Sequence, residues 1–210
     1  MNKNIKSVVI AFLLLANMQL FAQRPKEINN SEVEGFYLTV SAFKQGKLTI
    51  PTDKKHEGDK INLKQFFISP DIISIEQDKE TVFYKDSIFA IRLTNGEDYR
   101  FINRTPFLIA DTSALYIYTY KTTKTVYIQS GRHNRAKKIP ITNYYFSTAN
   151  HSETFKLSLE NIRKNALPDP YVHTAVCNKF TTDEMLQKIN SKTGLFELNE
   201  TILSQLLNRE

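Results

Sequence analysis

This sequence has few of the residue patterns that mark a chemical site. Its single cysteine, Cys177, excludes an intramolecular disulfide, so we expect the hydrophobic core to supply the stability. Its six glycines are scattered, and none lies in a phosphate-binding loop or a dinucleotide fingerprint. No zinc motif or nucleophile elbow is present either. We therefore predict no metal and no cofactor, and we assign no catalytic residue.

His173 and Cys177 come closest to a ligand pair. They lie four residues apart on a predicted helix and would share a face, where they could hold a metal or pair a thiolate with its base. A metal site would need two more ligands, and the other histidines are scattered along the chain. We therefore interpret Cys177 as a small, buried apolar residue beside a surface histidine.

The chain also lacks an apolar run long enough to span a membrane. The longest, Ser7–Leu15, has nine residues, whereas a bilayer-spanning helix needs about 20. Lys3 and Lys6 precede this run, and Ala22 ends the segment with a small residue. These three parts predict a signal peptide over residues 1–22, cleaved before Gln23, and a periplasmic or secreted mature protein. Its removal lowers the formal charge from +6 to +4.

The remaining chain is long enough for one compact domain, with an ordinary 41% hydrophobic and 24% charged composition. We predict a polar lead-in over residues 23–35, a β-rich part over 36–150, and a helical C-terminal part of the same domain over 151–210. The expected fold is α+β, an antiparallel β-meander of about seven short strands, curled into a half-barrel or sandwich, with the helices packed on it.

The expected strands are short runs rich in β-branched and aromatic residues. They cover residues 72–76, 81–85, 87–93, 99–103, 106–110, 115–120, 126–129 and 143–147. Asn95-Gly96 predicts a two-residue hairpin turn, because both residues tolerate positive φ. Tyr116, Tyr118 and Tyr120 would share one face of a strand.

Helix signals lie at both ends of the mature chain. Residues 36–46 predict a short helix that Thr39 caps and Gly46 ends. Ser158 and Asp169 are expected to cap two later helices, and residues 181–184 form a capping box that predicts a third. Leu198, Ile202 and Leu206 give the final helix an apolar stripe.

Several of these segments resemble a pattern found in exported proteins of Bacteroidota. They are residues 85–91 (KDSIFAI), 99–101 (YRF), 115–118 (LYIY), 144–147 (YYFS) and 157–162 (LSLENI). The resemblance covers roughly residues 36–205. It implies export and continuity of fold but no mechanism, because this group has no assigned activity.

The charge surplus is confined to one segment. Residues 112–152 contain six basic and no acidic residues, while the segments before and after each carry a slight negative charge. The basic residues, which are our candidates for anion contact, are Lys121, Lys124, Arg132, Arg135, Lys137 and Lys138. Tyrosines flank them, and basic groups interleaved with aromatics can bind an anionic polymer. The alternative is a solvated loop whose charges protect strand edges.

These features favour a non-catalytic envelope or secreted binding module. Its partner would be an anionic glycan, lipopolysaccharide, another lipid or a protein, and we do not expect nucleic acid in an exported protein. Two alternatives stay open: a small hydrolase-like periplasmic enzyme with its site in the mouth of the sheet, and a structural partner that uses an exposed tyrosine stripe.

Overall fold

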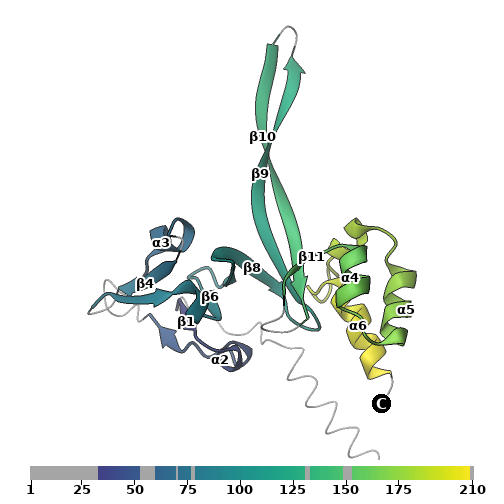
Figure 1. Cartoon of the computed structure of the whole chain (residues 1–210), viewed down its shortest axis with the longest axis horizontal. Coiled ribbons are helices and arrows are strands. Elements are labelled where there is room, and N and C mark those ends of the chain that lie inside the picture. Colours follow the sequence, from purple (N-terminus) through teal and green to yellow (C-terminus); the bar gives the residue numbers. More distant parts are fainter. Residues whose placement is uncertain are drawn as a thin grey trace, which may run out of the picture.

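The computed structural model describes residues 33–52, 60–69, 71–76, 79–130, 133–148 and 153–208. The predicted signal peptide, residues 1–22, and most of the polar lead-in lie outside these residues. The predicted α+β fold is confirmed: antiparallel strands form a meander, and three C-terminal helices pack beside it (Figure 1).

The main sheet has eight strands in the order β11-β10-β9-β8-β7-β6-β1-β2, so β6 to β11 are neighbours in sequence and in space. Their bounds are β1 Gly35–Tyr37, β2 Ile50–Pro51, β6 Ala90–Arg92, β7 Asp98–Ile102, β8 Thr105–Asp111, β9 Tyr116–Ser130, β10 His133–Ser147 and β11 Phe155–Lys156. Strand β1, which the sequence predicted as the start of a helix, pairs with β6 at the far side of the meander. Gly35 fits there because a Cβ would lie 2.4 Å from the carbonyl oxygen of Ile50.

A second, three-stranded sheet packs against the first. It contains β3 (Lys60–Ile61), β4 (Ile72–Glu76) and β5 (Thr81–Tyr84). Helix α3 (Leu63–Phe67) joins β3 to β4, and Phe66 is buried between the two sheets with Ile73, Ile75 and Ile91. Strand β4 has the predicted bounds. The last residue of the predicted strand 81–85, Lys85, instead starts a short 3₁₀ turn.

The Asn95-Gly96 hairpin is confirmed, but its turn differs from the prediction. The N–H of Gly96 donates to the carbonyl of Leu93 and that of Leu93 to the carbonyl of Glu97, which makes the link longer than two residues. Only Gly96 there has positive φ, so the turn needs one left-handed residue and not two. The two-residue turn is instead Asn103-Arg104, where both residues have positive φ, between β7 and β8.

Local capping signals located most helix starts correctly. Thr39 caps α2 (Val40–Lys44), Ser158 caps α4 (Leu159–Asn165) and Asp169 caps α5 (Pro170–Lys179), each through its side-chain oxygen. The capping box at residues 181–184 gives only a 3₁₀ turn, Asp183–Gln187: Thr182 makes no side-chain cap, and the Thr181 hydroxyl donates to the Met185 sulfur and does not accept from a backbone N–H of the described residues. None of the helices in the described ranges is long and apolar enough to cross a membrane.

The C-terminal helices are tied to the base of the β9–β10 hairpin. Helix α6 (Glu197–Leu207) buries Leu198 and Ile202 against Ile117 and Phe146 of the sheet. The side-chain amide of Asn199 both accepts from the N–H of Leu115 and donates to its carbonyl. A β-bulge between Ile109 and Asp111 ends β8, and the Asp111 carboxylate accepts from the N–H of Phe196 at the start of α6.

Candidate functional site

The basic segment lies in a long hairpin and is not the solvated loop between two strands that the sequence left open as the alternative. Strands β9 and β10 have 15 residues each and pair without interruption from Tyr116↔Ser147 to Ser130↔His133. The predicted strands 115–120 and 126–129 are therefore parts of one strand. Threonine, valine, tyrosine and isoleucine between the lysines maintain the strand, since all four have high β-propensity.

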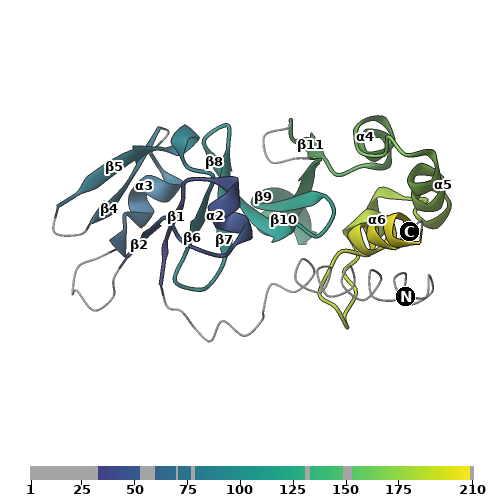
Figure 2. The same cartoon turned by 90° about the horizontal axis from the view of Figure 1, so that it is seen from below.

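Only the base of this hairpin belongs to the body of the protein. The last pair between β8 and β9 is Leu108↔Thr119, and β11 pairs with β10 only at Tyr145 and Phe146. Beyond these points both outer edges are unpaired in the described sheet, and we call this part, residues 120–130 and 133–143, the arm. At about 3.3 Å per residue it extends roughly 35 Å. It rises between the two packed parts of the body (Figures 1 and 2).

Five of the six predicted contact residues lie exposed on the arm: Lys121, Lys124, Arg135, Lys137 and Lys138. Arg132 lies outside the described residues. No arm cation forms a salt bridge with a described acidic residue, and the hairpin itself contains no aspartate or glutamate. Each of the five is opposite an uncharged residue in the register, which limits repulsion within the arm.

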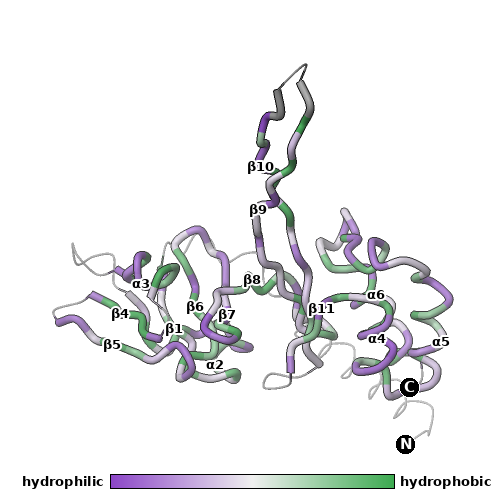
Figure 3. Tube along the Cα trace, turned by 45° about the horizontal axis from the view of Figure 1, so that its top comes forward, coloured by the Kyte–Doolittle hydropathy of each residue, from purple (hydrophilic) through white to green (hydrophobic). Residues whose placement is uncertain are grey.

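The two faces of the arm differ in composition. Directly opposed residues share a face, and faces alternate along each strand. One face carries the pairs Thr122–Ile141, Lys124–Ile139, Val126–Lys137 and Ile128–Arg135. The other carries Lys121–Thr142, Thr123–Pro140, Thr125–Lys138 and Tyr127–Ala136. We call these the aliphatic-basic face and the threonine face; Figure 3 shows hydrophobic and hydrophilic residues mixed along the arm.

Most of the predicted aromatic contacts do not reach the arm surface. Tyr116 and Tyr118 are buried in the body, where they pack with Phe43, Phe89 and Phe107. Tyr120, Tyr144 and Tyr145 are half-buried near the base. Tyr127, 74% exposed, is the one tyrosine of the described arm that is open to solvent. The exposed tyrosine stripe of the structural-partner hypothesis is therefore absent, because these side chains fill the core.

Pro140 and the lysines of the arm disfavour pairing of its outer strand edges with another strand. Proline lacks the N–H that a sheet ladder needs and is tolerated on edge strands, and β10 has an unpaired outer edge at Pro140. Lysines on an edge further disfavour pairing with another strand. At the arm's base, the Asn143 side chain donates to Thr122 Oγ1 at 2.9 Å and holds the strands together.

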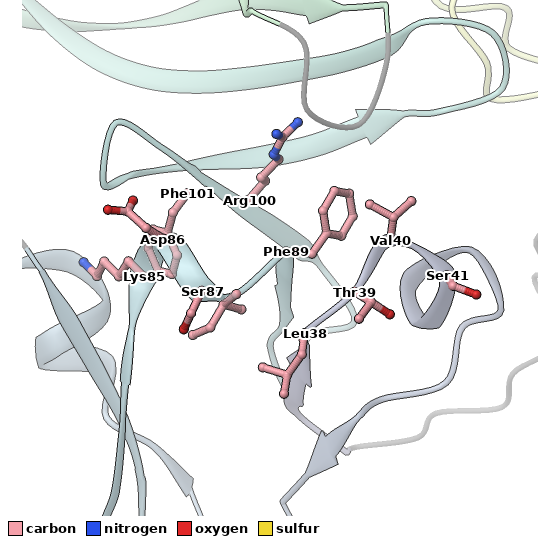
Figure 4. A pocket seen from close by; sticks show the side chains of 11 residues that line it. Leu38, Thr39, Val40, Ser41, Lys85, Asp86, Ser87, Phe89, Arg100 and Phe101 are labelled. Atoms are coloured by element: carbon pink, nitrogen blue, oxygen red, sulfur yellow. The ribbon is translucent and has the colours of Figure 1, made fainter.

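A separate depression of about 450 Å³ lies in the body, beside β6 and β7. Asp86 and Ser87 stand at one end and Val40 and Ser41 at the other, with Phe89 and Arg100 between them (Figure 4). Asp86 is the one carboxylate in this lining, which contains no histidine. Its carboxylate lies 3.8 Å from Arg104, and the ammonium of Lys85, the lysine of this lining, donates to backbone carbonyls.

The other polar clusters of the body hold the fold together. Arg100 donates to the hydroxyl of Tyr118 at 2.7 Å, and that hydroxyl also contacts Ser147. Lys85 is buried and donates to the carbonyls of Phe66 and Ser69 at the end of α3. Burial lowers the pKa of Lys85, against the opposing effect of the Asp71 charge.

His173 and Cys177 share a face of α5, as the spacing predicted. The Cys177 sulfur lies 3.7 Å from His173 Nδ1 and is half-buried. Within the described part of the chain, no group of three or more His, Cys, Asp or Glu side chains could hold a metal. The pair therefore has no further ligands there.

Sequence reasoning located the charges of the arm but missed its aliphatic residues. Val126 and Ile128 alternate with polar residues on β9, and Ile139 and Ile141 do so on β10. This alternation is a detectable period-two signal, and only the pairing register shows that the two strands contribute to one face. No family model matches this chain, and no similar curated protein or solved structure was found in the comparisons.

Proposed function

We propose that this protein is an exported, non-catalytic binding module that contacts an anionic partner in the cell envelope or outside the cell through its arm. One observation carries the proposal: the charge surplus of the mature chain comes from a single segment without acidic residues, and five of its six basic residues lie exposed on the arm. Unbalanced positive charge on a projecting element attracts anionic surfaces and speeds association with them.

The body of the protein does not need these charges. Surface cations usually contribute little to stability, and those of the arm have no described acidic partner. A two-stranded ribbon is only marginally stable in water, and this one extends well beyond the strands that support its base. A binding role accounts for both the length of the arm and the sign of its charge.

Export is the part of the proposal that rests on the sequence. Residues 1–22 have the three parts of a signal peptide, and the resemblance to exported Bacteroidota proteins points to the same compartment. Exported bacterial proteins meet anionic phospholipid, lipopolysaccharide and acidic glycans, which are the partners that a basic arm would bind. A periplasmic hydrolase is the alternative; in the depression beside Arg100 the one carboxylate, Asp86, has no histidine near it in the lining.

The proposal is tested with the mature chain, residues 23–210. The variant Lys124→Gln, Arg135→Gln, Lys137→Gln and Lys138→Gln removes four arm charges without removing an apolar residue. The matched control is Lys44→Gln, Lys47→Gln, Arg163→Gln and Lys164→Gln, which makes the same substitutions at exposed positions of the body. The probes are anionic phospholipid vesicles, lipopolysaccharide and a soluble acidic polysaccharide.

We expect salt-sensitive binding to at least one probe. Each cation near an anionic surface contributes about 1 kcal/mol to binding. The affinity of the arm variant for the probe should therefore fall by a factor of about one hundred or more at low salt. The body variant should bind almost as well as the unchanged chain. Equal losses in the two variants, or unchanged binding by the arm variant, would contradict the proposal.

A further inference from the structure

The aliphatic-basic face of the arm combines positive charge with exposed apolar side chains. Three of the four pairs that define it contain one basic and one aliphatic residue: Lys124–Ile139, Val126–Lys137 and Ile128–Arg135. The fourth pairs Thr122 with Ile141. Ile128, Ile139 and Ile141 are 47%, 39% and 37% exposed, although β-branched aliphatic side chains are usually buried in a sheet.

This face continues the pattern of the hydrophobic core into solvent. Near the base it carries Tyr116 and Tyr118, which are buried against the body. Farther out the same alternation continues with aliphatic residues, but the described body provides no buried cluster around them. A half-apolar strand face without a covering layer is typical of a surface that meets an apolar partner.

From this arrangement we infer that the aliphatic-basic face docks onto an anionic phospholipid bilayer. Lysine and arginine head groups would contact lipid phosphates, while the isoleucine and valine side chains enter the boundary between head groups and acyl chains. Interfacial membrane binding depends on this combination of buried apolar area and attraction to anionic lipid. The inference rests on the proposed function and names the partner of the same arm.

Other occupants fit the face less well. A single-stranded nucleic acid is bound largely by stacking on aromatic rings, and the one solvent-exposed tyrosine of the described arm, Tyr127, lies on the threonine face. An acidic glycan would use the charges of the arm but not its aliphatic side chains. A second copy of the arm would bring two unbalanced positive charges together. The lipid bilayer matches both the charge and the aliphatic residues.

The test separates the aliphatic contribution from charge. An aliphatic-face variant, Val126→Thr, Ile128→Thr, Ile139→Thr and Ile141→Thr, keeps every charge and every β-branched side chain. The opposite-face control is Tyr127→Thr and Ala136→Thr. Binding of the full mature chain is measured by co-sedimentation with phosphatidylcholine vesicles and with equimolar phosphatidylcholine and phosphatidylglycerol, and by capture on a soluble acidic polysaccharide.

We expect binding to the vesicles that contain phosphatidylglycerol and a loss of at least about tenfold in the aliphatic-face variant. The opposite-face control should bind normally, and both variants should keep the unfolding midpoint of the unchanged chain. If the aliphatic-face variant binds vesicles normally while the four-charge variant does not, lipid insertion is wrong and the proposed anion binding stands. Preference for the polysaccharide, with no effect of the threonine substitutions, identifies a glycan partner instead. No binding to any probe contradicts both proposals.

A second readout does not depend on loss of binding. The chain contains no tryptophan, so a single introduced indole reports its own environment. Ile128→Trp places it on the aliphatic-basic face and Tyr127→Trp on the threonine face. With vesicles whose acyl chains are brominated, we expect a blue shift and quenching only for Ile128→Trp. Equal quenching at both positions, or none at either, would overturn the face assignment.

Discussion

The base and the arm of the β9–β10 hairpin share one strand register but lie in different surroundings. At the base, Ile117 and Phe146 are buried under the C-terminal helices, and Tyr118 is buried on the opposite face. In the arm, the same alternation of side chains is exposed on both faces. The comparison shows that strand pairing alone does not determine what a hairpin does. The layers packed on it make the base part of the core and leave the arm available to a partner.

The largest expected effect tests the base. Phe146→Ala removes a fully buried ring that packs against Phe155 and the core under the helices. We expect the free energy of unfolding to fall by about 3–5 kcal/mol, because the substitution leaves a cavity that the surrounding core cannot fill. Urea denaturation followed by circular dichroism measures this loss.

The matched substitution in the arm is Ile139→Ala. Its side chain is 39% exposed, so the loss should be at most about 0.5 kcal/mol, as for ordinary surface positions. A loss comparable to that of Phe146→Ala would mean that the arm packs against the body, and the contrast between base and arm would then be wrong.

A smaller effect contrasts a buried lysine with the exposed lysines of the arm. Lys85→Met should lower the stability by about 1–2 kcal/mol at neutral pH, because two backbone carbonyls at the end of α3 lose their donor. Lys124→Met, in the arm, should have almost no effect on stability. Urea denaturation at a series of pH values measures both variants.

The pH dependence of the Lys85 effect has a definite sign. Burial lowers the pKa of Lys85 in the folded chain below its ordinary value of 10.5. At pH values between the lowered pKa and 10.5, the unfolded chain therefore binds more protons than the folded chain. The stability contributed by this group therefore rises with pH up to about 10.5. The difference between the unchanged chain and Lys85→Met should widen as pH rises from neutral; a shrinking difference would contradict the assignment.

Signals contained in a few adjacent residues were predictable from the sequence. Thr39, Ser158 and Asp169 cap helices where expected because a cap depends on the side chain and the next three residues. At the predicted capping box, residues 181–184, the Thr181 hydroxyl donates to the Met185 sulfur, and Asp183 accepts from the N–H of Leu159, a residue distant in sequence. Such a competing partner is not visible in a local pattern.

The arm also depends on partners that are distant in sequence and that a local pattern does not reveal. Its charges and tyrosines suggested a loop between short strands, whereas β-branched residues and pairing with the opposite strand extend the hairpin through the charged segment. The burial of Tyr118 was equally unpredictable, because it depends on Phe43, Phe89 and Phe107 from separate elements. The candidate residues of the arm were found, but their common face required the register.

Hydrogen exchange of the full mature chain, with and without vesicles that contain phosphatidylglycerol, tests the central claim most directly. In the free protein we expect slow exchange at the base, where neighbouring strands and helices cover the hairpin, and faster exchange along the arm. With vesicles, residues 120–143 should become protected while the body is unchanged, and high salt should reverse the change. Protection confined to the body, or an arm whose exchange does not respond to vesicles, would contradict a membrane-binding arm.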